Sequence, residues 1–427
     1  MHRTKEETAV KRIALISIVC LMLLAACAPA VQTAAPQEHA VPTQLPAGPT
    51  ALPPTLEPTA IPPTPTVETL PTAGPTQSTP DAAAPTTLLA IINAEGNVAL
   101  ISPSGSAGKT LSADATPRLN ADPKKPNVTF CCASWSSDGR LLAYQRYQTQ
   151  QKGTEVTNIF ELWVYDVSSG QSRVVLQNEQ TAGYAWQPGT HRIAYGQMVD
   201  PNYFTARGQN DPARARGILS LDVDTGEKAE LVKPERGLSI VSPVWSPDGR
   251  YLSFDEVLYM EGRGQFACYD FQGKKYTSWE KVIGGYAWAP DSQHIVYDHL
   301  AYNPSGDERI WISDLQGQNE QSLSPRDGPL AYGPVFSPKG DFLAYHAQPG
   351  GPASGDYDLM VVPAGGGEAK SLGSFPELGS IAWAPDGKQL AISYGPYENS
   401  QLKLVSLADG STGDLGPGSF PVWQPLP

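Results

Sequence analysis

One short sequence pattern recurs along most of this chain and constrains its fold more than any other feature. Its clearest copy, Trp-Ser-Pro-Asp-Gly-Arg-Tyr-Leu-Ser-Phe at 245–254, places four turn-forming residues between two apolar runs. Serine can bond to the backbone, proline presets φ, aspartate tolerates the third turn position, and glycine accepts a positive φ. A type I turn followed by a left-handed glycine is a common hairpin connection, so each copy predicts a strand, a turn and a strand.

The pattern returns at intervals of 40 to 59 residues, measured between its leading aromatic residues. Each complete copy is followed by an aliphatic strand, a variable loop, a third strand and a glycine-bearing turn into a fourth strand. Repeats of this length, built from strands and turns, predict the four-stranded blades of a β-propeller. The leading aromatic residues, whose tryptophans we expect in the core, are Trp135, Trp186, Trp245, Trp288, Phe336, Trp383 and Trp423.

The two ends of the repeat region complement each other. Residues 88–111 supply three strands without an innermost one, whereas 420–423 is an innermost strand with no strands after it. Pairing the two ends closes the ring and removes both free sheet edges. We therefore predict an all-β fold, a β-propeller of seven four-stranded blades closed by a C-terminal inner strand. Six or eight blades are the alternatives, and each would follow if one irregular segment is misassigned.

The repeats resemble the TolB-type propeller repeat. The shared elements are an aromatic residue, Ser or Ala, Pro, Asp, Gly, a basic residue, and a strand that ends in Ala and Tyr or Phe. The resemblance spans 88–427 and implies a TolB-like propeller. The Tol-system role does not carry over, because a Pro/Thr-rich segment stands where TolB has a separate domain. The peptidase activity of prolyl oligopeptidases, which share the repeat, does not carry over either, because no Gly-x-Ser-x-Gly motif follows the repeats.

The N-terminal region has the pattern of an export signal. Basic residues end at Arg12, and 13–24 is apolar but short for a membrane span. The Leu-Ala-Ala-Cys sequence at 24–27 resembles the lipobox of bacterial lipoproteins, which implies cleavage before Cys27 and lipidation of that cysteine. An ordinary cleaved signal with an incidental cysteine is the alternative. Two or more acyl chains would anchor the protein stably, in the outer membrane and periplasm or on the outer cell surface.

These features divide the chain into three parts. We expect a lipoprotein signal peptide over 1–26, a lipidated Cys27 with a disordered Pro/Thr-rich linker over 27–85, and the TolB-like propeller over 86–427. The net charge of −13 argues against a nucleic-acid partner. We expect a monomer without a cofactor that is attached to the membrane through Cys27 and binds an envelope protein or polysaccharide.

Long irregular loops should gather on one face of the propeller, where recognition usually occurs. The loop 196–217 adds aromatic and basic side chains to an acidic protein, and aromatic residues also enter several inner strands. A solvated insertion and packing between blades are the alternative explanations for these side chains. The binding candidates are Tyr203, Phe204 and Arg207 in the loop, and Tyr184, Tyr286 and Tyr332 at the inner strands.

Signals for catalysis are weak, so the sequence predicts a non-enzymatic interaction platform with no catalytic residues and no metal site. The alternative is a metal-dependent, lyase-like carbohydrate-active enzyme on the long-loop face. Its candidate ligands are Asp298, His299 and His346, with Asp255 and Glu256 one blade earlier. Propellers of the oligogalacturonate lyase kind hold a divalent metal with histidines, but the full ligand set that this resemblance implies has no match here.

Three cysteines remain in the propeller region. Cys131 and Cys132 are adjacent and either form a vicinal disulfide or stay as free buried thiols, and free thiols are the prediction. Cys268 is expected two blades away, which makes it a poor disulfide partner for either.

Overall fold

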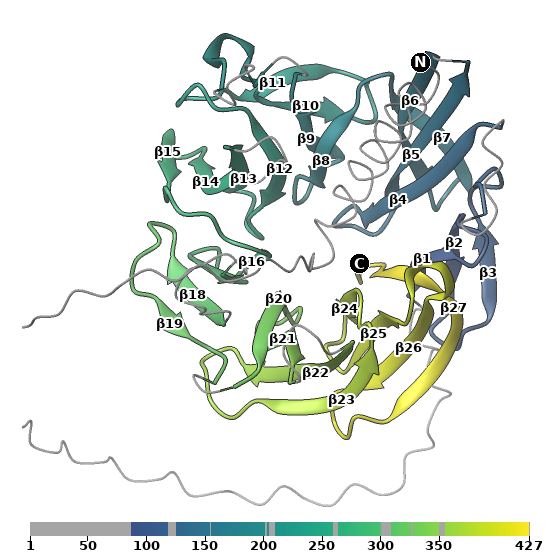
Figure 1. Cartoon of the computed structure of the whole chain (residues 1–427), viewed down its shortest axis with the longest axis vertical. Helices are drawn as coiled ribbons and strands as arrows, with labels where there is room; N and C mark the ends of the chain where they lie inside the picture. Colours follow the sequence, from purple (N-terminus) through teal and green to yellow (C-terminus); the bar gives the residue numbers. More distant parts are fainter. Residues whose placement is uncertain are drawn as a thin grey trace, which may run out of the picture. The chain divides into compact units, whose positions relative to one another are not determined.

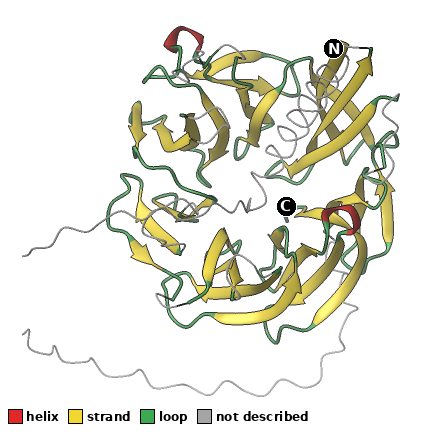
Figure 2. Ribbon diagram, in the orientation of Figure 1, coloured by secondary structure: helices red, strands yellow, loops and turns green. Residues whose placement is uncertain are grey.

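The computed structural model describes residues 87–117, 125–153, 155–200, 203–204, 210–258, 264–299, 309–325, 328–349 and 355–426. These residues form strands and turns, apart from two short 3₁₀ turns, η2 (Pro212–Arg214) and η3 (Tyr397–Asn399) (Figure 2). No helix in this part of the chain is long and apolar enough to cross a membrane. The expected signal peptide, Cys27 and the linker 27–85 lie outside the described residues.

Five four-stranded antiparallel sheets follow one another along the chain and around a common centre (Figure 1). The first contains β4 (Asn127–Trp135), β5 (Leu141–Lys152), β6 (Glu155–Asp166) and β7 (Gln171–Gln177). The second contains β8 (Thr181–Trp186), β9 (Arg192–Gln197), β10 (Ile218–Asp222) and β11 (Lys228–Val232). The third contains β12 (Ile240–Trp245), β13 (Tyr251–Val257), β14 (Gly264–Asp270) and β15 (Lys275–Ser278). The fourth contains β16 (Tyr286–Trp288), β17 (His294–Asp298), β18 (Ile310–Asp314) and β19 (Gln321–Ser322). The fifth contains β20 (Leu330–Phe336), β21 (Phe342–Gln348), β22 (Asp356–Pro363) and β23 (Lys370–Pro376).

The sixth sheet joins the two ends of the repeat region. Its strands, in spatial order, are β24 (Ile381–Trp383), β25 (Gln389–Tyr394), β26 (Gln401–Ser406), β27 (Thr412–Trp423), β1 (Leu89–Asn93), β2 (Val98–Ile101) and β3 (Ala107–Thr110). The first half of β27 pairs with β26, where Thr412 is opposite Val405. The second half pairs with β1, where Trp423 is opposite Leu89. This second pairing is the predicted contact between the chain ends.

The predicted all-β propeller is thus present, but the sheets differ from the seven separate four-stranded ones expected. The described residues form five four-stranded blades and one seven-stranded sheet. The physical reason is that β27 continues without a break from its pairing with β26 into its pairing with β1.

The repeated turn forms as its residue types predict. In the third sheet the hydroxyl of Ser246 lies 2.6 Å from a carboxylate oxygen of Asp248 and accepts a hydrogen bond from the N–H of Tyr251 at 2.9 Å. Gly249 has a φ of +71°, the left-handed conformation that closes the turn, and its N–H donates to the Ser246 carbonyl. The Asp residue therefore stabilises the hairpin, which is the structural role expected for these turn carboxylates.

Five of the innermost strands carry an irregularity three residues before the leading aromatic residue. In five strands the residue at this position has a positive φ, between 53° and 82°, and the strand register shifts beside it. A bulge of this kind bends the strand and re-aims nearby side chains. The residues are Cys132, Gly183, Ser242, Gly333 and Phe420.

Candidate functional site

One residue position recurs in the second strands. It lies three residues after the residue that pairs with the leading aromatic residue of the innermost strand. We call this set the second-strand ring, and its polar members are Gln145, Asp255, Asp298, His346 and Ser393. Four of them are buried, whereas Asp255 is partly exposed. Sequence analysis selected Asp255, Asp298 and His346 from this ring but not Gln145 or Ser393. The signal that could have found them is the equivalent position of all five residues in their repeats.

Asp298 is fixed by backbone donors from two neighbouring sheets. One of its carboxylate oxygens accepts a hydrogen bond from the N–H of Gly285 at 3.1 Å and from the N–H of Gly333 at 2.9 Å. The approach is close, because a Cβ atom added at Gly284 would lie 1.7 Å from the other carboxylate oxygen. Only glycine fits there, so the local sequence Gly284-Gly285 is a requirement of the Asp298 position.

His346 occupies the same position one sheet later and is neutral. Burial lowers its pKa below the usual histidine value. Its Nε2 lies 2.6 Å from the carbonyl oxygen of Gly379, and its Nδ1 lies 3.3 Å from the carbonyl oxygen of Tyr332. A neutral imidazole has one N–H and can donate to only one of these oxygens, and the shorter distance assigns the proton to Nε2. A Cβ atom at Gly333 would lie 3.0 Å from Nδ1. Asp298 and His346 therefore both border Gly333, one as a hydrogen-bond acceptor and one as a neutral imidazole.

Two tyrosines stand beside His346 at the long-loop end of the fifth sheet. The rings of Tyr332 and Tyr357 are half-buried, and their centroids lie 6.3 Å apart. Tyr357 also packs edge-on against the imidazole of His346 at 6.4 Å. The hydroxyl of Tyr332 donates to the side-chain oxygen of Gln348 at 2.6 Å. We call Asp298, Tyr332, Gly333, His346 and Tyr357 the Gly333 cluster.

His299 lies apart from this cluster although it follows Asp298 in the chain. Its ring stacks on Tyr297 and on Trp311, with centroid distances of 5.7 and 5.6 Å. Successive residues of a strand face opposite sides of the sheet, which explains the separation. Asp298, His299 and His346 therefore do not converge. No group of three His, Cys, Asp or Glu side chains suited to a metal ion occurs in the described part of the chain.

Asp255 is the ring member with the most perturbed acidity. The residue keeps some exposed surface, but desolvation of its carboxyl group raises its pKa to about 7, against a smaller opposing effect of its hydrogen bond with Ser242. The adjacent Glu256 points to the other side and bonds with Tyr276 and Arg236 at 2.8 and 3.2 Å. Asp255 therefore changes charge near neutral pH, whereas Glu256 is part of a fixed polar network.

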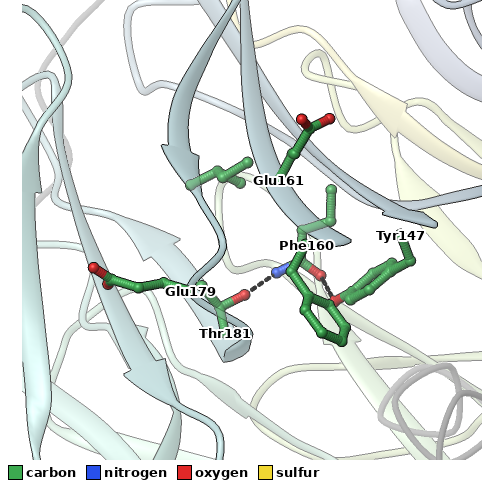
Figure 3. A pocket seen from close by; sticks show the side chains of 7 residues that line it. Tyr147, Phe160, Glu161, Glu179 and Thr181 are labelled. Carbon is green, nitrogen blue, oxygen red and sulfur yellow. Dashed lines mark hydrogen bonds between the residues drawn. The ribbon is translucent and has the colours of Figure 1, made fainter. Parts of the chain in front are cut away.

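Gln145 connects the ring to a small pocket between the first and second sheets (Figure 3). Its side-chain oxygen accepts a hydrogen bond from the hydroxyl of Tyr147, and its nitrogen donates to the hydroxyl of Thr181. The rings of Tyr147 and Phe160 meet edge to face at 5.3 Å. The pocket is lined by Gln145, Tyr147, Phe160, Glu161, Leu162, Glu179 and Thr181.

Within the loop 196–217, the described residue Tyr203 packs against the third sheet. Tyr203 has no exposed surface, and its hydroxyl accepts from the N–H of Ser239 at 3.0 Å and donates to the carbonyl of Val257 at 3.4 Å. Phe204 packs edge-on against Tyr203 at 4.8 Å. The ion pairs of Arg214 with Asp200 and Asp211 further tie the loop to itself. Arg207 lies outside the described residues.

The remaining candidate tyrosines bond to neighbouring strands. The hydroxyl of Tyr184 in β8 donates to the carbonyl oxygen of Cys132 in β4. The hydroxyl of Tyr286 in β16 lies 3.1 Å from that of Ser253 in β13, and its ring meets Phe266 edge-on. Tyr184 and Tyr286 thus join adjacent sheets, whereas Tyr332 belongs to the Gly333 cluster.

Cys131 and Cys132 form a disulfide, so the prediction of free thiols at these positions is wrong. The bulge at Cys132, with a φ of 62°, accommodates a bond between adjacent residues in an otherwise extended strand. Cys268 is a free, buried thiol, in agreement with its expected isolation.

Comparisons with known proteins identify the class of fold. No protein-family model matches the chain, and no curated protein matches it. Among solved structures it is similar to an oligogalacturonate lyase in complex with manganese, with 15% identity and a TM-score of 0.53 over 78% of this chain and 85% of that one. Prolyl endopeptidases match with 13% identity and a TM-score of 0.52 over 78% of this chain and 49% of theirs.

TolB from Acinetobacter baumannii is also similar, with 16% identity and a TM-score of 0.45 over 78% of this chain and 92% of that one. The described residues form a β-propeller, which is the fold that the repeats predicted. At these identities the likeness concerns the fold alone.

The prediction that the chain is not an enzyme, which rested on the weak catalytic signals in the sequence, is wrong. An oligogalacturonate lyase and prolyl endopeptidases contain the same kind of propeller. The fold therefore gives no reason to exclude catalysis, and activity has to be judged from the site itself.

Proposed function

We propose that this protein is an extracytoplasmic, membrane-anchored propeller lipoprotein that binds an envelope polysaccharide at the Gly333 cluster. The observation that carries the proposal is the pair of half-buried rings, Tyr332 and Tyr357, beside a neutral imidazole and a buried carboxylate. Sugar rings stack on aromatic faces, and convergent polar groups orient their hydroxyls. The connections between the second and third strands of the fourth and fifth sheets start at this end, and such connections often carry recognition.

The binding test uses the full chain and fractionated envelope polysaccharides, with affinity measured by calorimetry. We expect Tyr357→Ala to weaken binding at least about tenfold, which is 1.4 kcal/mol. Tyr357→Phe keeps the ring and serves as the matched variant, and Asp386→Asn changes an exposed turn on the opposite side of the sheets. Capture of envelope proteins in place of glycans, with unchanged capture by Tyr357→Ala, would contradict the proposal.

A second candidate is a carbohydrate-active enzyme that uses the same cluster. It is favoured by His346, a neutral imidazole that borders Gly333, the residue whose N–H donates to the Asp298 carboxylate, because a neutral imidazole can accept a proton. The test follows the appearance of new chain ends in polysaccharide incubated with the full chain, with manganese and with a chelator. Cleavage that is lost in His346→Ala while Tyr357→Phe stays active would favour this candidate.

The anchoring part of the proposal rests on the Leu-Ala-Ala-Cys sequence at 24–27. The disulfide between Cys131 and Cys132 fits an oxidising, extracytoplasmic compartment. Expression of the full chain and of Cys27→Ala in a bacterium, followed by detergent phase partitioning, provides the test. The unchanged chain should enter the detergent phase and Cys27→Ala the aqueous phase, whereas equal partitioning would argue against a lipid anchor.

We also propose that the seven-stranded sheet functions as two blades divided within β27, which gives seven blades in total. The support is a recurring contact: the indole of Trp423 donates to the carbonyl of Ala382 at 3.2 Å, and the indole of Trp135 donates to that of Val422 at 3.2 Å. The C-terminal half of β27 thereby occupies the place of an inner strand. Removal of residues 420–427 should lower the unfolding midpoint markedly, and an unchanged midpoint would contradict this division.

A further inference from the structure

The disulfide between Cys131 and Cys132 lies at the bulge of β4, the innermost strand of the first sheet. Cys131 is buried, whereas Cys132 is partly exposed. The disulfide therefore joins a buried residue to a partly exposed one.

This disulfide contributes little to holding the fold together. A disulfide stabilises a protein mainly by closing a loop in the unfolded chain, and adjacent residues enclose no loop. The bulge also forms without it, because Gly183, Ser242 and Gly333 have the same positive φ at the corresponding positions of other inner strands. The bond is thus dispensable for the local backbone shape.

The two cysteines are connected to the pocket of Figure 3. The Sγ of Cys131 lies 3.6 Å from the side-chain oxygen of Gln145, whose nitrogen donates to Thr181 in the next sheet. The carbonyl oxygen of Cys132 accepts the hydroxyl of Tyr184. A disulfide sulfur has no proton, but a thiol at Cys131 would donate one to Gln145. A change of redox state therefore alters the hydrogen bonds that link the first and second sheets.

We propose that Cys131 and Cys132 form a reversible thiol–disulfide exchange site whose reaction partner is a dithiol. A thiolate of the dithiol attacks the Sγ of Cys132, the partly exposed residue of the pair, and the Cys131 thiolate leaves and takes up a proton. The second thiolate of the dithiol then attacks the mixed disulfide and releases Cys132 as a thiol. The dithiol loses two electrons and two protons and becomes a disulfide, and the two cysteines gain both.

The test treats the folded full chain with dithiothreitol, alkylates free thiols, and maps the peptide that contains both cysteines by mass spectrometry. We expect no alkyl group on this peptide before reduction and one, on the partly exposed Cys132, after it. A separate sample that is reduced and then reoxidised before alkylation should again carry none. Buried Cys268 should stay unmodified throughout and reports that the chain remains folded. An alkyl group on this peptide without reductant, or none until denaturant is added, would each overturn the proposal.

A second measurement follows hydrogen exchange of the segments 145–152 and 181–186. Reduction should change exchange in both segments, and the double variant Cys131→Ser, Cys132→Ser should match the reduced chain. The variant Cys268→Ser, which alters a cysteine outside the pair, should retain the redox response. Exchange that is the same in the oxidised and reduced chains would overturn the connection to the pocket.

Discussion

The indole nitrogen of Trp186 donates a hydrogen bond to the backbone oxygen of Ser134, 3.1 Å away in the innermost strand of the preceding sheet. Ser134 directly precedes the leading aromatic residue of that sheet, Trp135. The same contact, from a repeat tryptophan to the residue before the previous aromatic, recurs around the fold. Its other donor and acceptor pairs are Trp135 with Val422, Trp288 with Val244, Trp383 with Val335 and Trp423 with Ala382.

Trp245 is the exception, and it provides a matched control for the first prediction. Its indole nitrogen is buried without a hydrogen-bond partner among the described residues. Both Trp186→Phe and Trp245→Phe remove ring volume, but only Trp186→Phe leaves a carbonyl unpaired. We expect Trp186→Phe to lower the free energy of unfolding by about 1–2 kcal/mol more than Trp245→Phe, measured by urea denaturation of the full chain. Equal losses would show that the hydrogen bond adds nothing to the packing.

The core position of these tryptophans could be predicted from the sequence, because each one stands in the same repeated pattern. A fixed turn, an alternating strand and a regular interval are local signals, and the structure confirms the strands and turns that they predict. The pairing of Trp423 with Leu89 could also be predicted, because 88–111 has three strands without an innermost one and 420–423 is an innermost strand without the other three.

The site was harder to predict because its contacts are non-local. Asp298 in the fourth sheet accepts the N–H of Gly333 in the fifth, and His346 lies beside the same glycine. The spacing of these residues in the sequence does not predict these contacts. His299 looked like a partner of Asp298 because the two are adjacent, yet strand alternation sends them to opposite sides. An irregular loop such as 196–217 gives no periodic signal, so the burial of Tyr203 was not predictable.

The loop 196–217 should stabilise the fold through the hydroxyl of Tyr203. Tyr203→Phe removes the acceptor for the buried N–H of Ser239 and the donor to Val257 while leaving the ring in place. We expect the free energy of unfolding to fall by about 1–3 kcal/mol, measured by urea denaturation. A change smaller than the experimental error would mean that water replaces the hydroxyl at both groups.

Asp298 should be replaceable by asparagine but not by alanine. A single oxygen accepts both backbone donors, and an asparagine side-chain oxygen in the same place can do the same. Asp298→Ala leaves the N–H groups of Gly285 and Gly333 unpaired, at an expected cost of about 2–4 kcal/mol in the free energy of unfolding. Asp298→Asn should cost less than half as much, and similar losses in thermal melts would show that the negative charge matters more than the acceptor.

Asp255 should make the stability of the protein depend on pH. Burial raises its pKa from 3.8 to about 7, so between these values the folded chain holds a proton that the unfolded chain has released. Unfolding then releases a proton, and the free energy of unfolding falls as the pH rises from about 4 to 7, by up to about 4 kcal/mol. Above pH 7 both states are ionised and the loss is complete.

Asp255→Asn is uncharged at every pH and should remove this dependence. Urea unfolding at pH 5 and pH 8 gives the comparison: the unchanged chain should lose stability between the two, and the variant should lose less. Asp386→Asn, which alters an exposed turn carboxylate, should behave like the unchanged chain. A pH dependence that is the same in Asp255→Asn and in the unchanged chain would mean that the Asp255 carboxyl group ionises in the folded protein as readily as in the unfolded one.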